Sequence, residues 1–184
     1  MKKVLYTDVN GDGKLDLVTA NSTASSYSVL VGTGTGTFAT PVTVALTTAP
    51  SMLVSGDFNK DGKPDLAFSS PVGNAVAIYL NSGTGSFSAS TPVAIPAGAN
   101  PAYLAVADLN GDGKQDLVTV NQGNDTASIL IGNGTGGFVV GTPLTTGSSP
   151  RNVVVADING DKMLDLAVSN GLANTVSVLL QRCQ

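Results

Sequence analysis

Four short acidic segments carry almost all of the negative charge in this chain. The first runs from Asp8 to Asp16 with the sequence DVNGDGKLD, and related nonapeptides begin at Asp57, Asp108 and Asp157, at spacings of 49, 51 and 49 residues. Of the 13 acidic residues, all Asp, twelve lie in these segments, and removing those twelve charges would move the formal net charge from −4 to +8. Carboxylates gathered in this way indicate cation sites rather than a generally acidic surface.

Each segment places oxygen-bearing side chains at positions 1, 3, 5 and 9, as Asp, Asn, Asp and Asp. Alternate side chains of a loop can converge on one hard cation, and position 7 would add a backbone carbonyl. Calcium fits best, because it accepts six to eight oxygens at roughly 2.3–2.6 Å, whereas magnesium requires a stricter octahedron. The predicted ligands are Asp8, Asn10, Asp12, Lys14 and Asp16; Asp57, Asn59, Asp61, Lys63 and Asp65; Asp108, Asn110, Asp112, Lys114 and Asp116; and Asp157, Asn159, Asp161, Met163 and Asp165.

Position 6 is glycine in the first three segments, at Gly13, Gly62 and Gly113. A sharp bend there requires a positive φ, which glycine adopts without steric cost. The fourth segment has Lys162 instead, and a non-glycine residue in that conformation costs about 1–2 kcal/mol. We therefore expect up to four calcium ions, with the site that begins at Asp157 the weakest.

The segments are not EF-hand loops. An EF-hand loop closes with a bidentate Glu at position 12, where this chain has Thr19, Phe68, Thr119 and Val168. The flanking residues are short apolar runs rich in β-branched side chains, which predict strands. Each segment should therefore join the two strands of a hairpin. A plain Asp-Gly turn is the alternative for a single copy, but four copies in one register favour a metal site.

Each unit of about 50 residues repeats more than its acidic segment, with boundaries near 1–49, 50–100, 101–149 and 150–184. A third strand is expected near residues 28–31, 77–80, 128–131 and 177–180. A glycine turn ending on Phe38, Phe87 or Phe138 follows, then a fourth strand opened by Pro41, Pro92 or Pro143. Four short antiparallel strands per unit predict an all-β fold with the blades of a single β-propeller domain over residues 1–184.

The unit resembles the FG-GAP or VCBS repeat, the calcium-loop blade of integrin α-subunit heads and of many bacterial surface and secreted proteins. The resemblance covers essentially all 184 residues. It implies calcium between the first and second strands of each blade, and a protein or glycan ligand on the opposite face. That face would carry the loops near residues 22–27, 71–74, 122–126 and 171–174 and the crossings near 49–51, 100–103 and 149–152.

Such propellers commonly have seven blades, whereas this chain has four, the last without an outer strand after Leu179-Leu180. A monomer would then expose strand edges and apolar blade faces. We expect either a piece of a larger propeller or a homo-oligomer in which two copies make eight blades.

Composition argues against several other functions. The chain lacks His, Glu and Trp and has one cysteine, Cys183, in its tail, which excludes His-dependent triads and the common zinc sites, so we expect no enzyme. Asp125, the one Asp outside the acidic segments, is predicted to be a solvated turn residue. Nine scattered basic residues argue against nucleic-acid binding. No apolar run approaches the roughly 20 residues of a membrane span, so no membrane insertion is expected.

The sequence thus predicts a non-catalytic, calcium-stabilised propeller that serves as an adhesion or protein-binding scaffold. Calcium sites of this kind suit the millimolar calcium outside cells, so an extracellular, periplasmic or cell-surface location is expected. One alternative is a calcium-dependent lectin in which Tyr27 or Tyr103 stacks on a sugar, although a tyrosine at a strand end more often packs a blade. Another is a fragment or ancillary domain of a polysaccharide-active enzyme. Cys183 is expected to be inert, with an intermolecular disulfide as the alternative.

Overall fold

The computed structural model describes residues 3–181, which form seventeen β-strands in four antiparallel sheets. We call the sheets blades 1 to 4. Blade 1 contains β1 (Lys3–Thr7), β2 (Asp16–Asn21), β3 (Ser26–Leu30) and β4 (Val42–Ala45). Blade 2 contains β5 (Met52–Gly56), β6 (Asp65–Ser70), β7 (Ala75–Asn81), β8 (Phe87–Ala89) and β9 (Val93–Ala94). Blade 3 contains β10 (Pro101–Ala107), β11 (Asp116–Asn121), β12 (Thr126–Gly132), β13 (Phe138–Val140) and β14 (Leu144–Thr145). Blade 4 contains β15 (Pro150–Ala156), β16 (Asp165–Asn170) and β17 (Thr175–Leu179).

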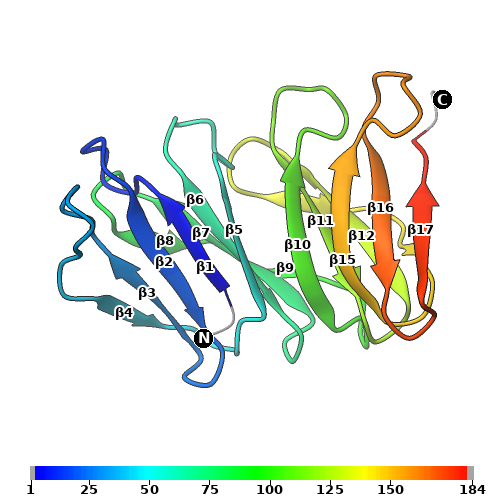
Figure 1. Cartoon of the computed structure of the whole chain (residues 1–184), viewed down its shortest axis with the longest axis horizontal. Helices are drawn as coiled ribbons and strands as arrows, with labels where there is room; N and C mark the ends of the chain where they lie inside the picture. The colour runs from blue at the N-terminus through cyan, green and yellow to red at the C-terminus, as the bar shows by residue number, and fades with distance from the viewer. Residues whose placement is uncertain (1–2, 182–184) are drawn as a thin grey trace.

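The blades follow one another in chain order and lie side by side (Figure 1). Within each blade the strands are hydrogen-bonded in sequence order, and the first strands β1, β5, β10 and β15 contact one another from blade to blade. These contacts place the first strands innermost. The arrangement is four blades of an open β-propeller, and the fourth has three strands in the described range, as predicted. The described part of the chain has no helix that could cross a membrane.

In blade 1 the outer strand β4 directly follows Pro41, as predicted, whereas the outer strand of blades 2 and 3 has an additional segment before the Thr-Pro pair. In blade 2 it begins at Phe87, pauses at Pro92 and resumes at Val93, and both parts pair with β7. Ala89 pairs with Tyr79 and Val93 with Val76, so four steps along the outer strand match three along β7. Blade 3 repeats this extra residue. Proline has no N–H to donate to the β-ladder. A bulge places the proline where no carbonyl of the neighbouring strand needs that donor.

Apolar side chains of alternate register fill three separate cores, one between each pair of neighbouring blades. In β6, Leu66 and Phe68 pack toward blade 1, whereas Ala67 packs toward blade 3. In β11, Leu117 packs toward blade 2 and Val118 toward blade 4. The central strands are therefore buried on both faces, and each blade depends on its neighbours for burial.

Tyr27 lies in the core between blades 1 and 2, with none of its surface exposed. Its ring is 5.3 Å from that of Phe68, 5.4 Å from Tyr79 and 6.2 Å from Phe87, measured between centroids. Burial raises the pKa of Tyr27 to about 12. Tyr27 therefore packs between blades, as is usual for a tyrosine at a strand end, and the alternative that its ring stacks on a sugar is wrong. The expectation for Cys183 lies outside the described residues.

Replacing Tyr27 should open a large cavity in the first interblade core. We expect Tyr27→Ala to lower the free energy of unfolding by about 3–5 kcal/mol, measured by urea denaturation followed by circular dichroism. Val72→Ala, at a side chain that is 82% exposed, is the control and should change stability by less than about 0.5 kcal/mol. Equal effects of the two substitutions would contradict the packing described.

Candidate metal centre

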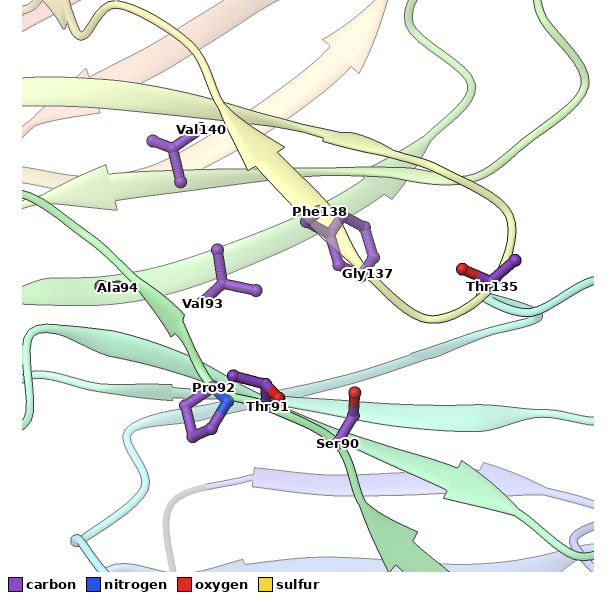
Figure 2. Close-up of a pocket in the computed structure, with 9 residues that line it drawn as sticks. All are labelled: Ser90, Thr91, Pro92, Val93, Ala94, Thr135, Gly137, Phe138 and Val140. Carbon is purple, nitrogen blue, oxygen red and sulfur yellow. The ribbon is translucent and has the colours of Figure 1, made fainter.

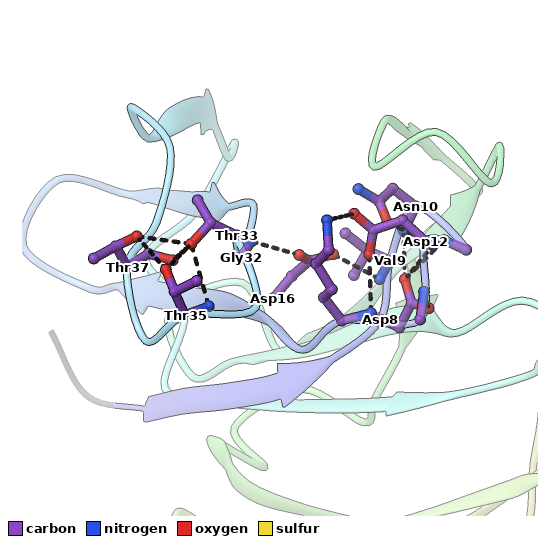
Figure 3. A network of polar contacts seen from close by, with 12 residues as sticks. Asp8, Val9, Asn10, Asp12, Asp16, Gly32, Thr33, Thr35 and Thr37 are labelled. Carbon is purple, nitrogen blue, oxygen red and sulfur yellow. Dashed lines mark hydrogen bonds and ion pairs between the residues drawn. The ribbon is translucent and has the colours of Figure 1, made fainter.

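The carboxylate at loop position 9 is buried and joins the acidic loop to the third strand of its blade. Asp16 Oδ2 accepts a hydrogen bond from the backbone N–H of Val9 at 2.9 Å, and its Oδ1 accepts one from Gly32 at 2.7 Å (Figure 3). Asp65, Asp116 and Asp165 repeat both bonds at 2.8–3.0 Å. All four side chains belong to residues with no exposed surface. Sequence reasoning identified these residues only as ligands and missed this structural connection.

The position 1 carboxylate lies on the opposite, solvent-facing side of the loop and accepts several backbone amides. Asp8 Oδ1 accepts from Gly11 at 2.7 Å, and Oδ2 accepts from Gly13 at 2.7 Å. The Gly13 amide, with those of Gly11, Asn10 and Asp12, lowers the pKa of Asp8, and burial opposes this shift. Asp108 is held in the same way by Gly111 and Gly113, both at 2.8 Å. The chain thereby fixes an ionised carboxylate at the mouth of the loop.

Positions 3 and 5 hold the next turn of each loop. In the first loop, Asn10 Oδ1 accepts from the Asp12 amide at 3.0 Å and Asp12 Oδ1 accepts from the Lys14 amide at 2.9 Å. The other three loops repeat both bonds at 2.9–3.1 Å. This use of one side-chain oxygen per residue leaves Oδ2 of the position 5 carboxylate facing outward.

A lysine at position 7 pairs with that outward oxygen in three loops. The distance from Lys Nζ to Asp Oδ2 is 3.5 Å in the first loop, 3.4 Å in the second and 2.9 Å in the third. The Lys114 hydrogen bond lowers the pKa of Asp112. Burial by contrast raises the pKa of Asp65 at position 9, although two amides bind it. The carboxylates at positions 5 and 9 therefore lie in environments that shift their pKa values in opposite directions.

The loop bends twice into the left-handed region. Position 6 has a positive φ in all four loops, including 71° at Lys162, as predicted. Position 4 does so as well, with 62° at Lys60 in the second loop. Sequence reasoning missed this second bend, although glycine at position 4 of the other three loops was its signal. Loops 2 and 4 therefore each hold one lysine in a conformation that costs about 1–2 kcal/mol.

The loops also contact the glycine turn of the following blade. The backbone N–H of Gly85 in blade 2 donates to the Val9 carbonyl at 3.1 Å, and that of Gly136 in blade 3 donates to the Phe58 carbonyl at 2.9 Å. The Asn81 side chain adds a bond from Nδ2 to the same Val9 carbonyl at 2.9 Å. The first two acidic loops thus belong to the interface with the next blade, a contact that the sequence did not reveal.

The donor set fits calcium by its chemistry, because positions 1, 3, 5 and 9 of each loop offer only carboxylate and amide oxygens. Each loop has three carboxylates against one or two lysines, which leaves a net charge of −2 or −1. Within residues 3–181 no three carboxylates lie close enough together to hold a metal ion. Position 9 is also committed to two amides, so positions 1, 3 and 5 are the ones whose side-chain oxygens lie at the surface of the loop.

The face opposite these loops carries turns held by left-handed residues at one register position, namely Ser25, Asn74, Asp125 and Asn174. Asn74 Oδ1 accepts the Asn100 amide at 3.0 Å, and Asp125 Oδ1 accepts the Ser149 amide at 2.7 Å. These bonds tie a turn of one blade to the crossing that leads into the next. Asp125 is therefore a structural capping residue, and the prediction of a merely solvated side chain is corrected.

Two hollows lie between blades, and the larger one reaches two residues of the acidic loops, Asn110 and Met163. A cleft of about 450 Å³ separates the outer strands of blades 2 and 3 (Figure 2), and it is lined by Ser90, Thr91, Pro92, Val93, Ala94, Thr135, Gly137, Phe138 and Val140. A larger groove of about 1160 Å³ lies between blades 3 and 4, where apolar residues such as Leu109, Ile131 and Leu179 line it. Neither set of lining residues includes a titratable side chain.

Comparison with known families agrees with the repeat pattern. The model of the FG-GAP-like repeat matches three overlapping segments, residues 8–68, 57–119 and 108–168. Each match spans two successive acidic loops, and together they cover most of the chain. No curated protein sequence matches it.

Solved structures share the fold at low sequence identity. The crystal structure of BBS1N in complex with ARL6DN matches with a TM-score of 0.65 and 18% identity over 98% of this chain and 57% of that one. A protein from Lactobacillus plantarum matches with a TM-score of 0.61 and 20% identity over 97% of this chain and 54% of that one. The V. cholerae biofilm matrix protein Bap1 matches with a TM-score of 0.51 and 19% identity over 90% of this chain and 27% of that one. The chain thus spans about half the length of the first two.

The two kinds of loop carboxylate should respond differently to the same substitution. We expect Asp116→Asn to lower the free energy of unfolding by about 1–3 kcal/mol in EDTA, because the amide NH₂ would face a backbone N–H in a buried site. Asp112→Asn, at the exposed position 5 of the same loop, is the matched control and should leave the urea midpoint in EDTA unchanged. A larger loss from Asp112→Asn than from Asp116→Asn would contradict these assignments.

Proposed function

Because the chain belongs to the FG-GAP-like repeat family, we propose that it is a non-catalytic, calcium-binding propeller scaffold that binds a partner outside the cytoplasm. The observation that carries this proposal is the fourfold recurrence of one loop, with the same side-chain and backbone hydrogen bonds at positions 1, 3, 5 and 9. A loop that served only as a turn would not need three carboxylates at the same positions in every copy. A conserved hydrogen-bonding frame around them is what a structural cation site requires.

The residues proposed to face calcium are the side chains at positions 1, 3 and 5, with the position 7 carbonyl. In the first loop these are Asp8, Asn10, Asp12 and Lys14. Asp16 holds the loop from its buried side. When bound, calcium supplies the positive charge that offsets three neighbouring carboxylates. The chain contributes the frame: backbone amides orient the position 1 carboxylate, and the lysine at position 7 pairs with the position 5 carboxylate at 2.9–3.5 Å.

Calcium binding would support the fold through the interface that each loop shares with the next blade. The position 2 carbonyl of the loop accepts the glycine-turn amide of the following blade, so rigidity gained in a loop extends to that interface. Binding that occurs only in the folded state adds directly to stability. This coupling supports a structural rather than a catalytic function for the cation.

The proposed partner is a protein or glycan bound on the face opposite the acidic loops. The turns there are pinned by Asn74 and Asp125 to the interblade crossings, so they form a rigid surface. Two solved structures of this fold support the scaffold proposal by what they are, a protein crystallised in complex with another protein and a biofilm matrix protein. An extracellular, periplasmic or cell-surface location follows from the calcium concentration that such sites need.

The lectin alternative has lost one of its two aromatic candidates. Tyr27 is fully buried, and Tyr103 is partly buried against the cores on both sides of blade 3. No observation favours the enzyme-fragment alternative over the scaffold. We therefore keep the protein-binding scaffold as the proposal.

Calcium should raise the melting temperature of the protein, and EDTA should reverse the rise. At 10 mM calcium and a dissociation constant near 10⁻⁴ M, each occupied site adds about 2.7 kcal/mol. Differential scanning calorimetry in calcium, in EDTA and in equimolar magnesium measures the effect, and magnesium should give a smaller shift. Identical melting temperatures in calcium and EDTA would refute the calcium proposal.

The fourth loop should bind calcium more tightly once its strained lysine is removed. We expect Lys162→Gly to raise calcium affinity at that loop severalfold, because glycine tolerates the φ of 71°. Titration calorimetry of the variant against the unmodified chain gives the comparison. Lys162→Ala, which removes the same charge but keeps a side chain at positive φ, serves as the control and should bring a smaller gain. An unchanged affinity after Lys162→Gly would show that strain does not weaken this site.

A further inference from the structure

Three of the four acidic loops contain an asparagine that is followed directly by glycine. These pairs occupy loop positions 3 and 4 and are Asn10-Gly11, Asn110-Gly111 and Asn159-Gly160. The second loop has Asn59-Lys60 instead. Asparagine is chemically labile, because the backbone nitrogen of the next residue can attack its side-chain carbonyl carbon. A following glycine favours this attack, since it has no side chain to hinder the nitrogen.

The attacking nitrogen has open surroundings in these three loops. Gly11, Gly111 and Gly160 are exposed, with φ of 76°, 73° and 81°, and a Cβ placed on any of them would meet no atom within 4 Å. The asparagines before them are exposed or half-buried. A five-membered ring can therefore form at these positions without displacing a neighbouring residue.

Hydrogen bonds within the turn hold both reacting groups. Asn10 Oδ1 accepts the Asp12 amide at 3.0 Å, and the Gly11 amide donates to Asp8 Oδ1 at 2.7 Å. Figure 3 shows Asp8, Asn10 and Asp12 gathered in this turn. The third loop repeats the two bonds at 3.0 and 2.8 Å, and the fourth at 3.0 and 2.7 Å. A donor on the carbonyl oxygen stabilises the negative charge that develops there during attack, and an anionic acceptor makes the glycine nitrogen more electron-rich.

Two other asparagines lack one of these features each. Asn59 is followed by Lys60, whose side chain hinders the approach to the backbone nitrogen. Asn170-Gly171 has the glycine, but Asn170 is 2% exposed and its Nδ2 donates to Ser177 Oγ at 2.9 Å. Both asparagines should therefore remain intact in the folded protein.

We propose that Asn10, Asn110 and Asn159 are sites of spontaneous deamidation in the folded protein. The glycine nitrogen attacks the asparagine Cγ and forms a C–N bond, the Cγ–Nδ2 bond breaks, and the side-chain nitrogen leaves as ammonia with the proton of the glycine amide. Water then opens the resulting succinimide ring at either carbonyl, which gives aspartate or isoaspartate. Asn159 Nδ2 also donates to Asp161 Oδ2 at 2.9 Å, which holds the leaving nitrogen, so this site should react more slowly. The reaction does not require calcium.

The products change the loop that is proposed to bind calcium, and this consequence rests on that proposal. Aspartate at position 3 raises the number of carboxylates in the loop from three to four, and calcium affinity depends on the charge of the ligand set. Isoaspartate instead lengthens the main chain by one atom and displaces the side-chain oxygen. Asn110→Asp, which copies the first product, should therefore bind calcium more tightly in titration calorimetry. Unchanged affinity would contradict this consequence but not the deamidation.

Peptide mapping by mass spectrometry tests the deamidation on the folded chain, incubated in EDTA at mildly alkaline pH. Each conversion of an amide to a carboxyl adds about 1 Da. Asn10 and Asn110 should react at least about tenfold faster than Asn59, because glycine leaves the attacking nitrogen open. Asn133, an exposed residue before glycine outside the acidic loops, should react as well and serves as the positive control. Rates at Asn10 and Asn110 no higher than at Asn59 would overturn the proposal.

Exchanging the position 4 residue between two loops tests the route of attack. Gly111→Lys copies the second loop, which accommodates Lys60 at a φ of 62°, so the loop should keep its fold, as circular dichroism checks. This variant should slow deamidation at Asn110 at least about tenfold and leave Asn10 unchanged. Lys60→Gly should make Asn59 about as reactive as Asn110. If neither exchange altered these rates, attack by the position 4 nitrogen would be wrong.

Unfolding provides the control for burial. In urea Asn170 loses its protection and should deamidate, whereas in the folded protein it should remain an amide. Deamidation of Asn170 in the folded chain as fast as that of Asn110 would contradict the dependence on exposure from which the sites were assigned.

Discussion

A buried carboxylate at loop position 9 is the interaction on which each blade depends. Asp16, Asp65, Asp116 and Asp165 lie fully inside the protein, where an unpartnered charge would cost several kcal/mol. Each instead accepts two backbone amides, one from loop position 2 and one from the end of the third strand, sixteen residues further along the chain. The first hairpin and the third strand are thereby joined at one point. Burial still raises the pKa of Asp65, which shows that the two amides offset the cost only in part.

The buried carboxylate fixes the position of loop residue 2, and residue 2 in turn connects neighbouring blades. Its amide binds the carboxylate, its side chain enters the next interblade core, and in blades 1 and 2 its carbonyl accepts the glycine-turn amide of the next blade. One residue therefore connects loop, core and neighbouring blade. The solvent side of the same loop carries the carboxylates proposed to bind calcium. Fold and proposed function thus share a single nine-residue segment, which explains why substitutions at its different positions should have different effects.

Much of this architecture could be predicted from local patterns. The fourfold spacing, the hairpin at each loop and the positive φ at position 6 depend on residues within about ten positions of one another, and all three are present. The strand order followed from repetition. The sequence also indicated that four blades would leave apolar faces exposed, and Tyr6 and Val178 are such residues.

The missed features depend on contacts between distant segments. Tyr27 is buried because Phe68, Tyr79 and Phe87 surround it, and these belong to the next blade. Asp125 caps an amide 24 residues away. The anchoring of the loop by position 9 was hidden because a ligand pattern and a buried anchor use the same residue type. The bulge at Pro92 required the register of β7, which composition alone does not provide.

The number of calcium ions bound per chain tests the central claim most directly. Titration calorimetry on the unmodified chain, freed of metal beforehand, measures it without reference to a partner or to oligomeric state. The predicted result is four sites in the four loops that share the same hydrogen-bonding frame, with weaker binding at the second and fourth loops, where Lys60 and Lys162 are held at positive φ. Absence of binding at millimolar calcium would contradict it and would leave the loops as turns held together by their own carboxylates.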